Sequence, residues 1–537
     1  MDFIIPTNVS HVTETLKNAG FEAFLVGGCV RDLLISNNGF SNDSSISARL
    51  EKGNGVKPEQ GFEQMLEISE SLEKPLNNYV SQEPKDWDIT TNAKPEQIVK
   101  LFEDKGFKVV YENNFGTVSI VFEEESFTSS VRDVQITPYR LESEYSDNRH
   151  PDSVSFSDTI HDDLSRRDFT MNAIALDPET FEIIDPFHGK QAIEKQMIIS
   201  VGDAKDRFTE DALRIMRAIR FSAQLGFTVS HETMNAISET RELLNNVSAE
   251  RIRDEFIKII NSDAPAIALF HMKQLGLLEI VLPEIIPAIG CEQGGVHIYD
   301  VFDHLVYALQ HAADKKFPFH IRLAALFHDI GKPKTRRPGH KKAYTFYGHE
   351  VVGARIAQKI MERLKFSKTE TELVVKFVRW HMFFSDTESI TLSAVRRMIA
   401  NVGADYIWQL MQIRECDRVG MNKTEAPYRL RKYFAMIEEC LRDPISVSQL
   451  KVDGNYLMKE LSVKPGPRMG WMLHALLEEV LEDPEKNTIE YLSKRVGEFE
   501  QLSDADLKQL GEAGKERKEQ EEQEEVKKLH VKHGVKK

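Results

Sequence analysis

The sequence predicts a multidomain protein in which a small mixed α/β domain at the N-terminus is followed by blocks that are all helical. Three observations favour this arrangement. The chain has 537 residues, more than one hydrophobic core usually serves. Short strand patterns bounded by turn residues occur up to about residue 141. From about residue 166 onward, apolar residues recur mainly at helical spacing.

Composition narrows the functional classes. Hydrophobic residues make up 41% and charged residues 29%, which excludes a globally disordered chain. The 85 acidic and 69 basic residues give a net charge of -16, so a polyanionic partner must be held by local basic patches. Cysteine occurs only at Cys29, Cys291, Cys416 and Cys440, with no Cys-x-x-Cys pair, which favours a reducing cytoplasm. Neither an export signal nor a membrane-spanning stretch is expected.

The predicted elements of the first domain begin with a buried strand over residues 24–26. It enters the turn Gly27-Gly28, and a helix starting over 30–34 turns its first N–H groups toward any bound anion. Residues 36–84 are rich in Asn, Ser, Gly, Glu and Lys and predict a loop insertion. The other predicted elements are strands over 86–90, 118–122 and 131–139 and a helix over 95–102.

Helical patterns dominate the remainder. One predicted helix covers 208–221, and a second helical block covers about 297–420 and includes a helix over 352–364. After Asp504 the chain alternates Glu and Lys with few apolar residues, which indicates a solvated helix or disorder.

Two aspartates mark the first candidate site. Asp86 and Asp88 lie two apart in a predicted strand, so both carboxylates share one face. Such a pair can hold two Mg²⁺ ions about 4 Å apart, although Asp-x-Asp alone is common in surface turns. The Gly27-Gly28 turn ahead of Arg31 adds a backbone that can approach phosphate closely, together with a cation. Together these features indicate chemistry on phosphates.

The segment Glu210-Asp211-x-x-Arg214 allows two interpretations. Asp211 and Arg214 are three apart on a predicted helix, and they could simply form an intrahelical salt bridge worth about 0.3 kcal/mol. Alternatively, they could read a base, because cytosine and adenine each offer an amino donor beside a ring-nitrogen acceptor. Uracil and guanine present the reverse order, which would leave buried polar groups unpaired. On this hypothesis the pair selects C and A.

Five motifs follow one another along the chain: LVGGCVRD at 25–32, DWDITT at 86–91, RRDFTMNA at 166–173, DPFHG at 185–189 and EDALRIMRAIRF at 210–221. As a set they resemble the class II tRNA nucleotidyltransferases, the CCA-adding enzymes, and their poly(A) polymerase relatives, over about residues 21–290. The resemblance implies a polymerase-β-like nucleotidyltransferase palm in which Asp86 and Asp88 hold the catalytic Mg²⁺. It also implies nucleotide-binding roles for Gly27, Gly28, Arg31, Arg166, Arg167, Asp168, Asp211, Arg214 and Arg217.

The chain departs from the family pattern in two places. The insertion at 36–84 replaces a much shorter loop, and its role stays open. Gln135 stands where the family often has Glu. Asp133 lies two residues earlier on the same strand face and is the alternative third carboxylate.

A second candidate site lies in the later helical block. An isolated histidine is more often a surface or core residue than a ligand, but here the run HDIGK at 328–332 ends an apolar helix. Imidazoles combined with carboxylates suit Mn, Fe, Co or Ni, or Mg²⁺. The block resembles the HD-domain metal-dependent phosphohydrolases. The resemblance implies one metal on His304, His328, Asp329 and Asp417, and a second completed by His349 and His381. An inert HD fold that only holds tRNA is the alternative.

The resemblance implies template-independent addition of CCA to tRNA 3′ ends from CTP and ATP, with a second phosphohydrolase activity in the HD domain. A poly(A) polymerase is the nearest alternative, but the segment Asn-Phe-Gly-Thr-Val at 114–118 is similar to the CCA-adding pattern. Addition of only CC or only A stays open. A hydrolase whose HD site carries the main activity is a further alternative. A non-enzymatic RNA-binding module is disfavoured, because binding does not require paired carboxylates.

We therefore expect a nucleotidyltransferase head over 1–141, a helical neck and body over 142–290 that binds nucleotide and tRNA, an HD domain over 291–425, and a helical tail over 426–537 with a charged end. Mg²⁺ is expected in the head and a divalent transition metal in the HD domain. No membrane contact or protein partner is implied.

Overall fold

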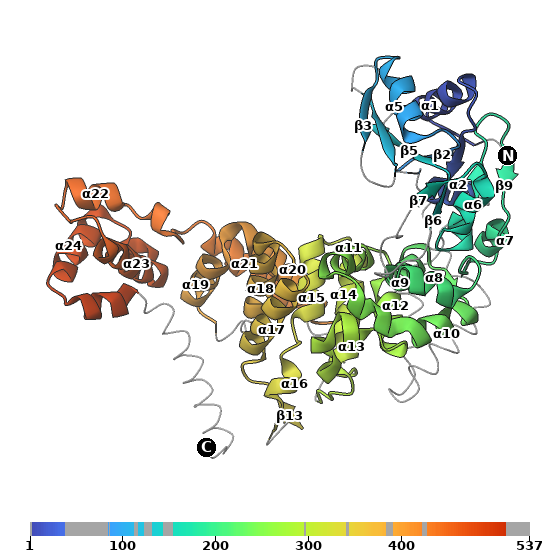
Figure 1. The fold of residues 1–537 in the computed structure, drawn as a ribbon. Coiled ribbons are helices and arrows are strands. Elements are labelled where there is room, and N and C mark those ends of the chain that lie inside the picture. The colour runs from blue at the N-terminus through green and yellow to red at the C-terminus, as the bar shows by residue number, and fades with distance from the viewer. Residues whose placement is uncertain are drawn as a thin grey trace. The chain divides into compact units, whose positions relative to one another are not determined.

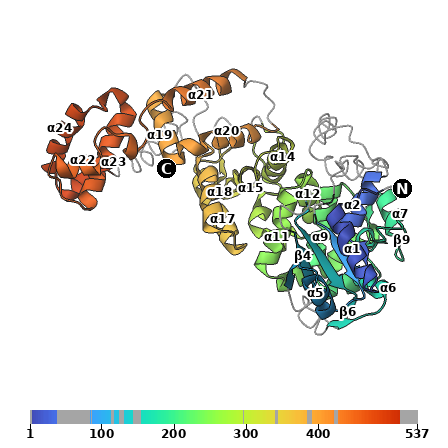
Figure 2. The same ribbon diagram turned by 90° about the horizontal axis from the view of Figure 1, so that it is seen from above.

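The computed structural model describes residues 3–37, 84, 86–111, 116–122, 131–142, 154–294, 297–339, 343–382, 390–420 and 427–511. The chain forms two compact units, one built mainly from Met1–Ile286 and the other mainly from the residues after it (Figure 1 and Figure 2). Most of the insertion predicted at 36–84 lies outside the described residues, as do residues 114 and 115 and the charged end beyond 511.

A mixed seven-stranded sheet forms the centre of the first unit, which confirms the predicted α/β class. The strand order is β3-β4-β5-β2-β1-β8-β9, in which β2 and β5 are parallel and every other neighbouring pair is antiparallel. Because β8 and β9 complete this sheet, it extends beyond the head boundary expected at residue 141. The strands are β1 (Phe24–Val26), β2 (Asp88–Thr91), β3 (Lys108–Tyr111), β4 (Val118–Val121), β5 (Asp133–Pro138), β8 (Ala175–Leu176) and β9 (Ile183–Ile184).

Three helices accompany the sheet: α1 (Thr7–Asn18), α2 (Gly28–Asn37) and α5 (Pro95–Glu103). Buried Ile98 and Phe102 lie four apart on α5, so they share the face that packs inward. The helix α2 starts immediately after β1, separated from it only by Gly27. This tight connection brings the N-terminus of α2 beside β2, the strand that pairs with β1.

The helices that follow the sheet differ from the prediction at one point. A continuous helix over 208–221 was predicted, and this is wrong, because α8 ends at Glu210 and α9 begins at Leu213. Asp211 between them has extended backbone angles, φ -136° and ψ 101°. Its Oδ1 accepts a hydrogen bond from the Leu213 N–H at 3.0 Å, as aspartate commonly does at helix starts. The helices here are α6 (Ile160–Ser165), α7 (Gly189–Glu194), α8 (Ala204–Glu210), α9 (Leu213–Leu225), α10 (His231–Thr240), α11 (Ala249–Ile260), α12 (Pro265–Gln274) and α13 (Leu278–Val281).

The second unit is mainly helical, as predicted. Buried side chains run without a break from Ile321 to Phe327 at the end of α15, so this helix lies inside the block. No helix in the described ranges is both long and apolar enough to cross a bilayer. The elements are α14 (Val301–Asp314), α15 (Phe319–Phe327), α16 (Lys332–Thr335), β12 (Arg337–Pro338), β13 (Tyr344–Thr345), α17 (His349–Arg363), α18 (Lys368–Trp380), α19 (Leu392–Val402), α20 (Ile407–Cys416), α21 (Pro427–Cys440), α22 (Gly454–Lys459), α23 (Pro467–Glu482) and α24 (Ile489–Glu500).

Candidate functional site

A polar pocket with a volume of about 450 Å³ lies in the first unit. Its walls come from the β1–α2 turn, the start of β2, the segment after α6, and the helices α9 and α11. The pocket is positively charged in a chain that is acidic overall, which suits a polyphosphate. Its charged lining residues are Arg31, Arg167, Arg214, Arg217, Arg220 and Arg251 against Asp88, Asp168 and Asp211.

Most of the predicted transferase residues line this pocket, but Asp86 and Arg166 do not. Asp86 is exposed just before β2, and the guanidinium of Arg166 donates hydrogen bonds of 2.9 and 2.6 Å to Asp163 Oδ1. The residues brought together as predicted are Gly27, Gly28, Arg31, Asp88, Arg167, Asp168, Asp211, Arg214 and Arg217.

Sequence reasoning missed five lining residues. Four of them lie inside the quoted motifs: Asn172, Leu213, Arg220 and Phe221. The fifth, Arg251, belongs to the first turn of α11. The available signal was the segment SAERIR at 248–253, in which a possible helix cap precedes two arginines.

Gly27 has backbone angles that favour glycine, with φ +81°. A Cβ at this position would lie 2.9 Å from Arg167 Nη1 and 3.9 Å from Asp88 Oδ2. Because Gly27 has no side chain, the turn, the guanidinium of Arg167 and the carboxylate of Asp88 can approach one another.

We expect Gly27→Ala to lower the free energy of unfolding by about 1–2 kcal/mol, because the side chain is strained at positive φ and also meets Arg167. Urea unfolding followed by circular dichroism measures this loss. Gly20→Ala is the matched control, since Gly20 has φ +88° but nothing within 4 Å of a Cβ. Equal losses in the two variants would show that the contact with Arg167 contributes nothing.

The carboxylate of Asp88 is affected by two neighbouring carboxylates and one arginine. Burial raises its pKa above the ordinary value, Asp86 and Asp133 raise it further, and only Arg167 acts to lower it. In the parallel pairing of β2 with β5, Asp88 is opposite Gln135. The position on β5 beside Asp88 thus holds the amide of Gln135, while Asp133, which is exposed, is the first residue of β5. The identity of a third carboxylate remains a prediction.

Two buried aspartates hold the arginines of the pocket in place. Asp163 Oδ2 accepts a hydrogen bond of 3.0 Å from Arg167, and Asp168 Oδ2 accepts one of 2.7 Å from Arg217 Nε. Burial alone would raise the pKa of Asp168, but the guanidinium of Arg217 and the amide of Asn172 hold it well below its usual value. The arginine side chains are therefore oriented before any ligand arrives.

Asp211 and Arg214 each have another partner. Asp211 Oδ2 accepts a hydrogen bond of 2.8 Å from Arg251 Nη2. Arg214 donates to Glu210 Oε2 at 2.7 Å and to the carbonyl oxygen of Arg166 at 2.8 Å. The interpretation of Asp211 and Arg214 as an intrahelical salt bridge is therefore wrong: the salt bridge of Arg214 is with Glu210. Both side chains nevertheless face the same pocket.

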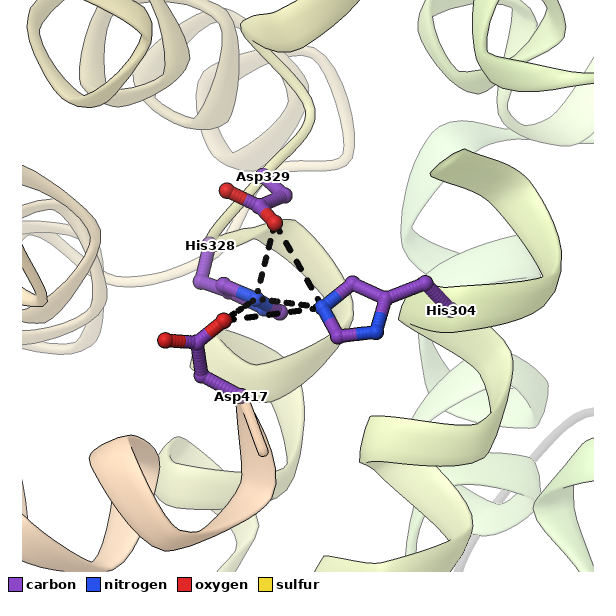
Figure 3. Close-up of side chains that lie close together, drawn as sticks. All are labelled: His304, His328, Asp329 and Asp417. Atoms are coloured by element: carbon purple, nitrogen blue, oxygen red, sulfur yellow. Dashed lines mark hydrogen bonds and ion pairs between the residues drawn. The ribbon is translucent and has the colours of Figure 1, made fainter. Parts of the chain in front are cut away.

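In the second unit, four predicted metal ligands meet at one point (Figure 3). His304 comes from α14, His328 and Asp329 follow α15, and Asp417 follows α20. The Nε2 atoms of His304 and His328 are 3.1 Å apart, and Asp417 Oδ1 is 3.3 Å from His328 Nε2. Asp329 Oδ2 lies 3.4 Å from His304 Nε2 and 3.3 Å from His328 Nε2. All four side chains are buried.

The two remaining predicted ligands meet the other oxygen of Asp329. His349 Nε2 lies 3.0 Å and His381 Nε2 lies 3.5 Å from Asp329 Oδ1, and the two nitrogens are 3.3 Å apart. Asp329 thus turns one carboxylate oxygen toward each cluster. This is the arrangement of a carboxylate that can bridge two metal ions.

The protonation of the rings fits a metal site. The Nδ1 atoms of His304, His328, His349 and His381 lie 2.7–3.2 Å from backbone carbonyl oxygens. A carbonyl can only accept, so Nδ1 carries the proton of each neutral ring, and Nε2 is the atom that faces the centre. Asp329 Oδ2 is buried and forms an ion pair with Lys332. Burial alone would lower the pKa of His328, but Asp329 and Asp417 raise it to about 10, so a metal ion would have to displace a proton from this Nε2.

Comparison with protein families agrees with this geometry. Residues 77–199 match the poly(A) polymerase head domain, residues 226–289 match the probable RNA- and SrmB-binding site of polymerase A, and residues 295–418 match the HD domain. The chain is thus similar to a poly(A) polymerase head domain, its RNA-binding region and an HD domain in that order. The head match contains Asp88 and Arg167, and the HD match contains all six predicted metal ligands.

Two CCA-adding enzymes illustrate the similarity in sequence. That of Geobacillus sp. (strain WCH70) is 37% identical over 266 residues, which is 50% of this chain and 52% of the relative. That of Lactobacillus johnsonii is 39% identical over 251 residues, 46% of this chain and 48% of the relative. The chain thus spans about half the length of the curated relatives it matches.

Solved structures share the fold over a longer stretch. The Bacillus stearothermophilus CCA-adding enzyme in complex with CTP has a TM-score of 0.59 at 22% identity, covering 92% of this chain and 98% of that one. The Thermotoga maritima CCA-adding enzyme complexed with tRNA has a TM-score of 0.50 at 16% identity, covering 93% and 100%. These similarities confirm the predicted fold class.

Proposed function

We propose that this chain adds C and A to tRNA 3′ ends, using CTP and ATP. The observation that carries the proposal is the pocket in which Asp88, the Gly27 turn and the Asp211–Arg214 segment line one arginine-rich cavity. The names of the relatives, all CCA-adding enzymes, support the same activity. Poly(A) synthesis and partial addition of CC or A are the alternatives, and the length and sequence of the extended tRNA distinguish them.

In this proposal the head binds the triphosphate. Arg31 and Arg167 neutralise phosphate oxygens, and the first N–H groups of α2 after Gly27 point toward the same anion. Asp88 and the adjacent Asp86 would hold Mg²⁺, because hard carboxylate oxygens suit that ion. When bound, the ions supply charge neutralisation at the phosphates and lower the pKa of the attacking hydroxyl.

In this proposal Asp211 and Arg214 recognise the base by giving up their present hydrogen-bond partners and binding the base edge instead. Asp211 must release Arg251, and Arg214 must release Glu210, before either can face the base edge. The released carboxylate accepts from the exocyclic amine of C or A, and the guanidinium donates to the ring nitrogen. Uracil or guanine would leave both groups unpaired, which costs binding free energy.

We expect Asp211→Ala and Arg214→Ala to weaken base choice, raising incorporation of UTP or GTP relative to CTP by about tenfold, since one hydrogen bond no longer discriminates. The measurement is extension of a tRNA lacking its 3′ end with each labelled nucleotide separately. Asp206→Ala, an exposed carboxylate on α8 outside the pocket lining, is the control. A uniform loss of rate with unchanged selectivity would contradict the base-reading role.

We propose a second activity, phosphohydrolysis, at the HD centre. His304, His328, Asp329 and Asp417 would hold one divalent ion, and Asp329, His349 and His381 a second. Imidazole ligands favour a transition metal there, which when bound would supply a Lewis acid for a phosphate ester. The alternative to a nucleotidyltransferase is a hydrolase, in which phosphohydrolysis at the HD centre is the main activity of the chain.

The two proposed activities lie in separate parts of the chain. We propose a head at 1–141, whose sheet is completed by β8 and β9 from the next segment, a neck and body at 142–290, an HD domain at 291–425 and a tail at 426–537. None of the four cysteines forms a disulfide and all four are buried, which supports a reducing compartment and hence the cytoplasm.

A further inference from the structure

We propose that Asp163 is a positioning residue of the transferase pocket: it holds Arg167 away from Asp88 and so leaves the Asp88 carboxylate free for a divalent cation. This role rests on the proposed nucleotidyltransferase function and deepens it. Asp163 itself does not line the pocket. Its role follows from which of two carboxylates Arg167 pairs with.

Arg167 lies between two carboxylates. Its Nη2 donates a hydrogen bond of 3.0 Å to Asp163 Oδ2. Its other amino group, Nη1, lies 2.9 Å from the point where a Cβ on Gly27 would stand, and Asp88 Oδ2 lies 3.9 Å from the same point. Arg167 and Asp88 both line the pocket, yet among the described residues the ion pair of Arg167 is with Asp163. The buried carboxylate therefore holds this guanidinium, and the carboxylate in the pocket does not.

Asp163 is a fixed anchor because both of its carboxylate oxygens are engaged. Its Oδ1 accepts hydrogen bonds of 2.9 and 2.6 Å from Nε and Nη2 of Arg166, while Oδ2 accepts the one from Arg167. Burial alone would raise the pKa of Asp163, but the two guanidiniums hold it below its usual value. A buried carboxylate of this kind cannot turn away from its arginines without leaving charges unpaired.

The carboxylate of Asp88, by contrast, has room for a cation. In the described part of the chain no hydrogen bond or ion pair engages its side chain, and only more distant charges act on it. Asp86 adds a second carboxylate two residues earlier. Such oxygen donors fit Mg²⁺. A guanidinium paired with Asp88 would compete with the ion, since both need the same oxygens.

Loss of the charge on Asp163 should redirect Arg167. In Asp163→Asn the amide oxygen still accepts a hydrogen bond, but the side chain no longer balances the arginines. Of the aspartates that line the pocket, Asp168 and Asp211 already have arginine partners. Arg167 is therefore expected to pair with Asp88, and a divalent cation would have to displace it.

The test measures metal binding at Asp88 directly, on the full chain. Bound Fe²⁺, with ascorbate and hydrogen peroxide, produces hydroxyl radicals that cut the backbone nearby, so the fragment length identifies the site. We expect Asp163→Asn to raise the Fe²⁺ concentration for half-maximal cleavage near residues 86–88 by about tenfold, since a charged hydrogen bond must be displaced. The Mg²⁺ concentration for half-maximal nucleotide addition should rise by a similar factor. Cleavage near the HD ligands is the internal control and should not change.

Two double variants separate positioning from net charge. Asp163→Asn with Arg167→Gln should return the Fe²⁺ requirement to within about threefold of the unaltered chain, because the competing arginine is gone. Asp163→Asn with Arg166→Gln has the same formal charge but keeps Arg167, so it should retain the loss. Asp162→Asn is the matched single control, because this carboxylate of α6 accepts a hydrogen bond from Ser157 and not from an arginine. It should leave the cleavage unchanged.

Recovery in both double variants, or in neither, would overturn the role of Asp163, as would unchanged cleavage near residues 86–88 in folded Asp163→Asn. If that variant does not fold, Arg167→Gln is compared with Arg217→Gln, which removes a pocket arginine that Asp168 holds. The two should alter the Fe²⁺ requirement equally within about threefold, because each arginine already has its own aspartate. A larger gain from Arg167→Gln would show that Arg167 competes at Asp88 despite Asp163, which also overturns the role.

These outcomes leave the nucleotidyltransferase function standing. No cleavage near residues 86–88 in the unaltered chain would instead overturn metal binding by Asp88, and with it both the proposed transferase mechanism and the role of Asp163.

Discussion

Asp88→Asn is expected to lower the rate of nucleotide addition at least about 10³-fold, because loss of a metal-binding carboxylate removes about 4 kcal/mol of charge stabilisation from the transition state. Asp88 begins β2 and lines the pocket beside Arg167. The affinity for tRNA should change by less than about twofold, since the contacts that hold a folded RNA lie mainly with its phosphates. Single-turnover primer extension measures the rate, and a filter-binding titration measures the affinity.

Two further variants sharpen this experiment. Asp104→Asn removes an exposed carboxylate at the end of α5 and should leave the rate unchanged. Asp133→Asn tests the alternative third carboxylate, because Asp133 acts on the pKa of Asp88 from the neighbouring strand. If Asp88→Asn extends tRNA at a near-normal rate, the Asp88 carboxylate is not needed for the chemical step, which contradicts the proposed mechanism.

The double variant His328→Ala with Asp329→Ala is expected to abolish the proposed hydrolysis of phosphate esters, a loss of about 10³-fold or more, while the proposed nucleotide addition continues at a nearly unchanged rate. Asp329 offers one oxygen to each metal cluster, so its loss should empty both. Metal content after dialysis, hydrolysis of bis(p-nitrophenyl) phosphate and tRNA extension are measured on the same preparation. The structural reason for independence is that the transferase pocket and the HD ligands belong to separate compact units.

His311→Ala is the control for this variant, because His311 lies on α14 with His304 but contacts Glu415 rather than a predicted ligand. Circular dichroism confirms folding in both variants. If the folded double variant also loses nucleotide addition, the HD domain is needed to place tRNA, and the two activities are not independent.

Local patterns predicted the elements near the sites well. The strand at 24–26 was predicted with its observed bounds, and the helix at 95–102 differs from α5 by one residue. The helix before HDIGK ends at Phe327, as its apolar pattern indicated. Strand starts were less accurate: β2 begins at Asp88 rather than at residue 86, and Asp86 is exposed before it. A strand begins where its neighbour offers hydrogen bonds, and the neighbour β5 comes from 45 residues later in the chain.

By itself the sequence determined which groups are available. Residue type and short spacing indicated the glycine turn, the paired aspartates and the arginine-rich helix, whereas the HD ligands, which span residues 304–417, were implied by the family resemblance. Only the tertiary structure decided how these groups are used. Asp211 ends up beside Arg251, 40 residues away, and Arg214 donates a hydrogen bond to the carbonyl oxygen of Arg166, 48 residues away. The two oxygens of Asp329 face different clusters, one with His304 from α14 and Asp417 after α20, and the other with His349 from α17 and His381 after α18. Spacing along one helix or strand fixes which side chains share a face, but the partner of a side chain is fixed by packing between segments distant in the sequence.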